Sequence, residues 1–157
     1  MSNTQPGHSQ PADDPTHVTT MWQDDRASAH LGIECLEVGL HQGEEHRPGR
    51  LGHARARMTV ADTMVNGHDI AHGGYIFTLA DSTFALACNA AGVRTVASAC
   101  DITFVTSARR GDVLVADAQE RAAYGRSGIT DVTVTREGDG ALVAEFRGRS
   151  RSLPPKH

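Results

Sequence analysis

The residues best suited to chemistry lie in one segment, residues 63–90 (TMVNGHDIAHGGYIFTLADSTFALACNA). Within it, Gly73 and Gly74 come directly before an apolar run that predicts a helix. The first N–H groups of a helix have no partners inside it and carry the positive end of its dipole, and glycines let another molecule approach closely. Such a helix start can stabilise a carbonyl oxygen as it gains negative charge in acyl transfer. The alternative is that the two glycines only form a tight turn.

Asp81 lies in the middle of the same predicted helix, with Phe77 and Phe84 near it at helical spacing. A carboxylate buried without partners costs free energy, and Asp is a poor helix former at an interior position. This placement indicates a carboxylate with a function. The alternative is a structural Asp that bonds Ser82, Thr78 or a neighbouring subunit.

Residues 68–72 (HDIAH) are similar to the HExxH zinc-protease motif, with Asp in place of Glu. Zinc binding by that motif needs both histidines on one face of a helix. Asn-Gly precedes the segment and Gly-Gly follows it, so a stable helix is not expected there. We therefore predict no metal and no cofactor, and a loop that holds Asn66, His68 and His72 near the helix start.

The helix itself is predicted over residues 74–91, since the segment lacks Pro and ends at Gly92. Eighteen residues make about 27 Å of helix. Because the segment is apolar nearly all round, it should be buried on most sides.

The remaining ordered chain is predicted to be mostly extended, with a short helix over residues 17–30. Alternating side chains and separators rich in Gly indicate strands joined by hairpins. The predicted strands are residues 31–41, 53–61, 94–108, 112–123, 126–137 and 141–152. Two strands, a buried helix and four antiparallel strands together predict an α+β domain.

Composition favours a single domain over residues 17–157, preceded by a disordered tail over residues 1–16, which is rich in Pro, Ser, Gln, Asn and Asp. We find no apolar run of about 20 residues and no signal-peptide layout, which predicts a cytoplasmic protein without a membrane segment. A net charge of −4 argues against nucleic-acid binding. Three widely spaced cysteines predict reduced thiols rather than disulfides or a zinc-thiolate site.

The pattern NGHxxxHGGxxFxLADxxFAxACN at residues 66–89 is similar to the core motif of PaaI-type (phenylacetate-degradation) thioesterases of the hotdog superfamily. Weaker similarities follow at residues 96–100 (VASAC), at Gly111-Asp112 and at residues 146–150 (FRGRS), so that the resemblance covers about residues 30–152. The sequence departs from the family pattern at residues 101–110, where a proline-containing turn is more usual. The resemblance implies a hotdog fold, in which a curved antiparallel sheet wraps one long central helix.

The resemblance also implies roles for individual residues. The Gly73 amide would polarise the thioester carbonyl, with Gly74 binding substrate beside it, and Asn66 would hold the carbonyl or the attacking water. Asp81 would act as general base on water or as nucleophile. His72 is expected mainly to shape the loop, with a direct catalytic role as the alternative. In the family the Asp and the glycine amide come from different subunits, which implies a homodimer or homotetramer with a composite site.

Three further residues are candidates for substrate binding. Ser98 is expected to share the helix-facing side of its strand with Val96 and Cys100, where it could touch the carboxylate or its water, or simply pack. Arg147 and Arg149 share the outward face of the last strand and could meet the phosphates of CoA. The alternative for them is a solvated basic face.

The expected function is hydrolysis of the thioester of a small, aromatic acyl-CoA of the phenylacetyl or hydroxyphenylacetyl type. One alternative is a non-catalytic acyl-CoA-binding hotdog protein, which would not need a carboxylate in the helix. Another is a hotdog hydratase or dehydratase, which pairs Asp with His in a different arrangement.

Overall fold

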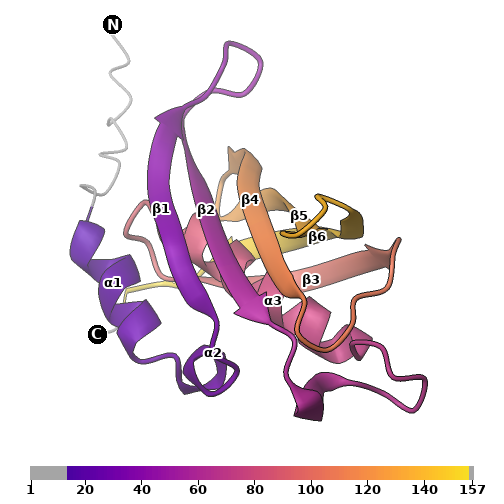
Figure 1. Cartoon of the computed structure of the whole chain (residues 1–157). Coiled ribbons are helices and arrows are strands. Elements are labelled where there is room, and N and C mark those ends of the chain that lie inside the picture. The colour runs from indigo at the N-terminus through magenta and orange to yellow at the C-terminus, as the bar shows by residue number, and fades with distance from the viewer. Residues whose placement is uncertain (1–13, 156–157) are drawn as a thin grey trace, which may run out of the picture.

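The computed structural model describes residues 14–155 (Figure 1). Its six strands are β1 (Glu34–Gln42), β2 (Arg50–Thr59), β3 (Thr95–Phe104), β4 (Val113–Tyr124), β5 (Ser127–Arg136) and β6 (Leu142–Ser152). They form one antiparallel sheet in the order β1-β2-β4-β5-β6-β3. The helices are α1 (Pro15–Gln23), α2 (Arg26–His30), the single-turn η1 (Asp62–Met64) and α3 (Gly73–Asn89). The predicted α+β class is confirmed. No helix in this part of the chain is long and apolar enough to cross a membrane.

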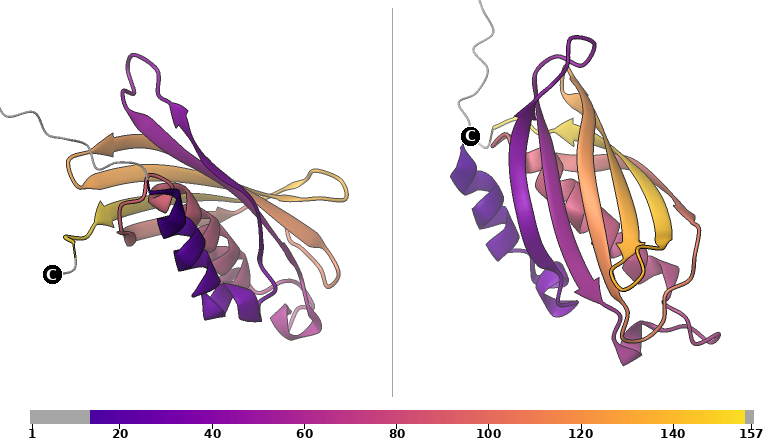
Figure 2. Two further views of the ribbon diagram at one scale, coloured as in Figure 1. Left: turned by 90° about the vertical axis from the view of Figure 1, so that its left-hand side faces the viewer. Right: turned by 45° about the horizontal axis from the view of Figure 1, so that its top comes forward.

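The long helix α3 lies in the concave face of the sheet, which curves around it (Figure 2). It starts at Gly73, one residue before the predicted start, and ends at Asn89, two residues before the predicted end. The end is fixed by Asn89, whose side chain exchanges hydrogen bonds of 2.9 and 3.0 Å with the backbone of Thr95 at the start of β3. A buried amide with these partners ties the end of the helix to the sheet edge.

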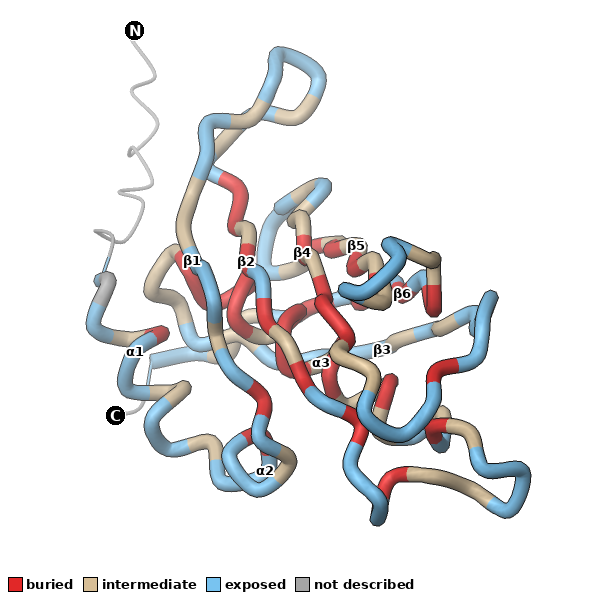
Figure 3. Tube along the Cα trace, in the orientation of Figure 1, coloured by how far each residue is buried: buried red, intermediate tan, exposed pale blue. Residues whose placement is uncertain are grey.

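Small residues on the inner face of the sheet let α3 approach closely. The fully buried alanines of β2 and β4 are Ala54, Ala56, Ala116 and Ala118. At Gly52 a Cβ atom would lie 1.8 Å from the carbonyl oxygen of Ala87, so only glycine fits there. Buried residues are concentrated on α3 and the strands over it (Figure 3).

The N-terminal segment forms two helices, α1 and α2, and the single helix predicted over residues 17–30 is wrong. The break falls where Asp25 caps α2, its side chain accepting a hydrogen bond from the Ser28 amide. Asp is favoured at such a cap because it satisfies an amide that has no partner within the helix. Helix α1 begins at Pro15, inside the predicted tail, and residues 1–13 of that tail lie outside the described residues.

Strand β3 forms one edge of the sheet and exposes large apolar side chains. It ends at Phe104, four residues before the predicted position. Val96, Phe104 and Val105 are 43%, 51% and 54% exposed. An exposed, apolar strand edge is typical of a surface that pairs with another chain.

A β-bulge at Ser98 changes which side chains of β3 face α3. Directly opposed residues of antiparallel strands point to the same side of a sheet. Val96 is opposite Arg151 of β6, whereas Cys100 is opposite Gly148, which lies against α3. The expectation that Val96, Ser98 and Cys100 share one face is therefore wrong, because the extra residue shifts the alternation.

Candidate active site

The loop before α3 is organised by Asn66. Its side-chain oxygen accepts a hydrogen bond of 2.9 Å from the His68 backbone amide, and its backbone N–H donates to the Ile70 carbonyl at 2.8 Å. The segment is a compact turn, so His68 and His72 do not share a helical face as zinc would require. Within residues 14–155 no group of three or more His, Cys, Asp or Glu side chains is placed to hold a metal ion.

His72 is the N-cap of α3. Its backbone amide donates to the Met64 carbonyl at 2.7 Å, and its Nδ1 accepts a hydrogen bond of 3.1 Å from the Gly74 amide. The Gly74 amide is therefore occupied, whereas the Gly73 amide has no hydrogen-bond partner among the described residues. The free donor at this helix start is thus Gly73.

A pocket of ≈ 330 Å³ opens at the same helix start. Its polar lining includes Asn66, Gly73, Thr106 and Ser107, and its apolar lining includes Ile70, Ile76 and Phe104. The Phe104 ring lies against Gly73, where a Cβ atom would be 2.8 Å from the ring. A carbonyl bound to the Gly73 amide would therefore lie beside an aromatic, mostly apolar surface.

Asp81 is half-buried in the third turn of α3. Among the described residues none forms a hydrogen bond or ion pair with its carboxylate. The two hydroxyls that could have held it are engaged elsewhere: Thr78 donates to the Gly74 carbonyl at 2.9 Å, and the Ser82 hydroxyl bonds Ser28 at 2.8 Å. Burial raises the pKa of Asp81. An unpartnered carboxylate of raised pKa suits a base or a nucleophile.

One face of α3 is not covered by its own sheet. Beyond the first turn, the residues of α3 that are not buried are Phe77, Thr78, Asp81 and Ala85. Their spacing places them along one side of the helix. Asp81 thus opens toward the uncovered side of the molecule, and the prediction of a helix buried on most sides holds except along this stripe.

The Gly73 amide and the Asp81 carboxylate cannot serve one reacting carbon within a single chain. Eight residues separate them along α3, which is about 12 Å of helix. Reacting atoms must come within about 3–3.5 Å of each other. Each chain therefore carries two candidate half-sites, an amide with its pocket and a carboxylate.

The predicted substrate-binding residues on β3 and β6 lie away from this helix start. Ser98 is exposed at the bulge, and its hydroxyl donates to the Arg149 carbonyl at 3.0 Å. Arg147 forms a bidentate pair with Asp131 at 2.6 and 2.9 Å, and Arg149 pairs with Asp101 at 3.2 Å. Both arginines are on the outward face of the sheet, as predicted, but each is already engaged by a carboxylate.

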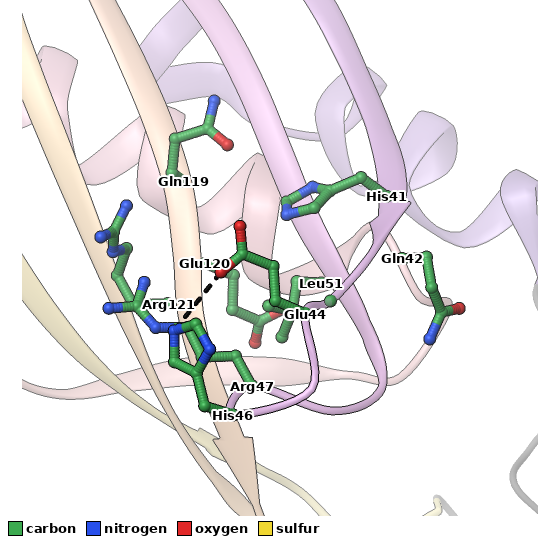
Figure 4. Close-up of a pocket in the computed structure, with 10 residues that line it drawn as sticks. His41, Gln42, Glu44, His46, Arg47, Leu51, Gln119, Glu120 and Arg121 are labelled. Atoms are coloured by element: carbon green, nitrogen blue, oxygen red, sulfur yellow. Dashed lines mark ion pairs between the residues drawn. The ribbon is translucent and has the colours of Figure 1, made fainter.

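A second pocket of ≈ 330 Å³, which sequence reasoning missed, lies between the β1–β2 loop and β4 (Figure 4). It contains Glu120, whose carboxylate accepts a 2.9 Å hydrogen bond from the Gly52 amide. Burial raises the pKa of Glu120 to about 7. At the rim, His46 and Glu44 approach to 3.4 Å. A register shift between Glu120 and Ala122 accompanies this placement, and no glycine or proline signals it in the sequence.

The chain is similar in sequence to known thioesterases. Residues 68–143 match the family model of the thioesterase superfamily. The chain is 38% identical over 133 residues to the acyl-coenzyme A thioesterase PaaI of Escherichia coli, covering 85% of this chain and 86% of that protein.

Solved structures give the same result. The structure of the E. coli PaaI protein from the phenylacetic acid degradation operon is similar with a TM-score of 0.78 and 35% identity, covering 90% of this chain and 94% of that one. A Streptococcus mutans protein bound to acetyl-CoA is similar with a TM-score of 0.64 and 26% identity, covering 77% and 92%. The hotdog fold is thereby confirmed. The chain belongs to the thioesterase superfamily and, within it, to the PaaI-type acyl-CoA thioesterases.

Proposed function

We propose that the protein hydrolyses the thioester of a small aromatic acyl-CoA, using Asp81 of one chain on a carbonyl held by the Gly73 amide of another. The observation that carries this proposal is the unpartnered Asp81 carboxylate on a helix whose first amide is also unpartnered. The aromatic ring of Phe104 at the Gly73 pocket supports an aromatic acyl group, as does the similarity to a protein of a phenylacetic acid degradation operon. A role in phenylacetate degradation is part of this proposal.

In the proposed reaction the Gly73 N–H donates to the thioester oxygen and stabilises the negative charge that develops there. Asn66 lines the same pocket, and because its oxygen is bound to the loop, its NH2 group is the donor left for the carbonyl or the water. Asp81 removes a proton from water as the water oxygen bonds to the carbonyl carbon. The C–S bond then breaks, and the proton passes to the departing CoA sulfur. Direct attack by Asp81, followed by hydrolysis of the anhydride, is the other route open to this carboxylate.

A two-chain site is supported by three features of the single chain. The two half-sites are about 12 Å apart along α3. The stripe of α3 that carries Asp81 is not covered. The β3 edge beside it exposes Val96 and Phe104. We propose a homodimer that covers the stripe and this edge, with further pairing into a tetramer.

For the rest of the substrate we propose that Arg147 and Arg149 meet CoA phosphates and that Ser98 contacts the site from the bulge of β3. The arginine ion pairs are exposed, and such pairs contribute little to stability. Exchange of a carboxylate partner for a phosphate is therefore inexpensive in free energy.

The test compares the wild type with Asp81→Asn on a panel of aromatic and aliphatic acyl-CoA thioesters. We expect aromatic thioesters to give the highest kcat/KM. Because the amide is nearly isosteric but neither accepts a proton usefully nor attacks, kcat of the variant should fall by at least about 10²–10⁴-fold, with KM and Tm little changed.

Near-wild-type kcat in a folded Asp81→Asn variant would contradict the mechanism. Absence of hydrolysis in the wild type would indicate a passive acyl-CoA binder. A drop in Tm with unchanged activity per folded molecule would indicate a structural Asp.

A further inference from the structure

A chain of hydrogen bonds connects the N-terminal helices to the turn of α3 that carries Asp81. The Asp25 carboxylate accepts from the Ser28 amide at 2.9 Å and from the Ser28 hydroxyl at 2.6 Å. The Ser28 and Ser82 hydroxyls are 2.8 Å apart. Since Ser28 gives its only hydroxyl proton to the carboxylate, Ser82 must donate to Ser28.

The two hydroxyls of this chain are buried, and Asp25 is half-buried. Ser28 is 1% exposed and Ser82 is 8% exposed. Ser82 is the residue next to Asp81, so the charge of Asp25 is held two hydroxyl groups away from the third turn of α3. Hydrogen bonds to a charged group in such surroundings are stronger than exposed ones.

We propose that Asp25 is a positioning residue for the thioesterase reaction: through Ser28 and Ser82 it fixes the turn of α3 that carries Asp81, and it holds a negative charge near that carboxylate. This inference rests on the proposed function of Asp81. It extends the active site to the N-terminal helices, which carry no residue of the family motif.

The electrostatic effect has the expected direction. Burial is the first cause of the raised pKa of Asp81, and the negative charge of Asp25 is the second. A neighbouring like charge favours the protonated form of a carboxyl group, and a base of higher pKa removes a proton from water more effectively.

Other titratable groups do not replace Asp25 in this role. The helix-facing side of β6 carries none among the described residues, and on β2 and β5 it carries Arg50, which lines a pocket with Cys88, and Arg136, which pairs with Asp139. Groups on the remaining elements packed on α3, and on α3 itself, include His17, Arg26, His30, Cys35, Tyr75, Cys88, Cys100 and Glu120. Burial raises the pKa of Cys88 and of Cys100, which keeps both thiols neutral. His17 forms a hydrogen bond with Asn89, and Glu120 accepts one from Gly52, which packs against Ala87. Both groups therefore lie at the C-terminal end of α3.

Asp25 also caps α2, and two substitutions separate the cap from the charge. Asn caps a helix as well as Asp does, so Asp25→Asn keeps the cap and removes the charge. Asp25→Glu keeps the charge, but Glu is not among the favoured capping residues. A purely structural Asp25 and a positioning Asp25 therefore predict opposite patterns for the two variants.

The experiment measures kcat/KM for phenylacetyl-CoA against pH, together with Tm, for the full-length wild type, Asp25→Asn and Asp25→Glu. The acid limb of this profile reports ionisation of Asp81 in the free enzyme. In Asp25→Asn the acid limb should move to lower pH by a few tenths of a unit to about one unit, and Tm should be unchanged. Added salt should reduce this difference in pH between the wild type and Asp25→Asn. In Asp25→Glu the limb should return toward the wild-type position although Tm falls.

An acid limb that stays in place in Asp25→Asn, or moves to higher pH, overturns the inference if Asp81→Asn abolishes activity in the same assay. If Asp81→Asn remains active, the proposed function itself fails, and the inference fails with it. The Asp81→Asn control therefore separates the two failures.

Discussion

Two polar groups on α3, the Asp81 carboxylate and the Gly73 amide, have no hydrogen-bond partner among residues 14–155. Asp81 is half-buried and Gly73 lines a pocket of ≈ 330 Å³. In the proposed site, a substrate carbonyl is the partner of the Gly73 amide, and a second chain brings the substrate water to the Asp81 carboxylate. At the scale of single residues, these two unpartnered groups are the basis of the proposed chemistry.

The Gly73 amide can be tested with the backbone left in place. His72 is extended (φ −65°, ψ 131°), which suits a following proline, and proline is well tolerated at the first position of a helix. Gly73→Pro removes the donor, and Gly73→Ala is the matched control because it adds the same crowding against Phe104 but keeps the N–H. We expect kcat of the proline variant to be about 10²–10³-fold below that of the alanine variant. Equal kcat values, measured in the same hydrolysis assay, would mean that this amide does not bind the carbonyl.

The sequence predicted residues whose signal is local and missed those that depend on distant strands and helices. Asp81, Gly73 and Asn66 lie within one contiguous motif, so their type and spacing could be interpreted directly. Asp25 and Glu120 could not be found in this way. The role of Asp25 depends on packing between residues 54 positions apart, and the burial of Glu120 depends on contact with Gly52 of another strand.

At the scale of elements, the predicted order of one long helix and six strands is confirmed, and the errors have local causes. The single helix predicted over residues 17–30 failed because Asp24 and Asp25 favour a cap over a helix interior. The bulge at Ser98 occurs in a run without glycine or proline, so alternation alone could not reveal it. Helix α3 ends at Asn89 because that side chain is bound to Thr95, a contact that helix propensity does not describe.

The position of Glu120 in β4 predicts a dependence of stability on pH. Its folded pKa of about 7 is above the ordinary value of 4.5, so between these values the folded state binds more protons than the unfolded state. The free energy of unfolding should therefore fall as pH rises from about 4.5 to 7, by at most about 3 kcal/mol. Glu120→Gln keeps an acceptor for the Gly52 amide and removes the ionisation.

Thermal unfolding at several pH values tests this prediction. Tm of Glu120→Gln should change less between pH 5 and 8 than Tm of the wild type, and the variant should be the more stable protein above pH 7. Glu44→Gln is the control, because Glu44 is exposed at the rim of the same pocket. Parallel Tm curves for the wild type and Glu120→Gln would show that Glu120 ionises normally.

At the scale of the whole molecule, residues 14–155 leave an apolar sheet edge exposed and the stripe of α3 that carries Asp81 only partly covered. Val96, Phe104 and Val105 are exposed at the end of the sheet, and α3 is open along Asp81. We expect light scattering coupled to gel filtration to give a mass of at least twice the 16.7 kDa of one chain. A stable monomer with full activity would be incompatible with a shared site.

The central claim, that one chain supplies Asp81 and another supplies the Gly73 amide, is tested most directly by mixing two inactive variants. Asp81→Asn and Gly73→Pro should each be nearly inactive alone. When equal amounts are unfolded and refolded together, about half of the dimers are mixed, and each mixed dimer has one of its two sites built from two intact halves. We therefore predict recovery of about one quarter of the wild-type kcat per chain. If differently tagged variants are shown to co-assemble and the mixture stays inactive, the site lies within one chain and the account is contradicted.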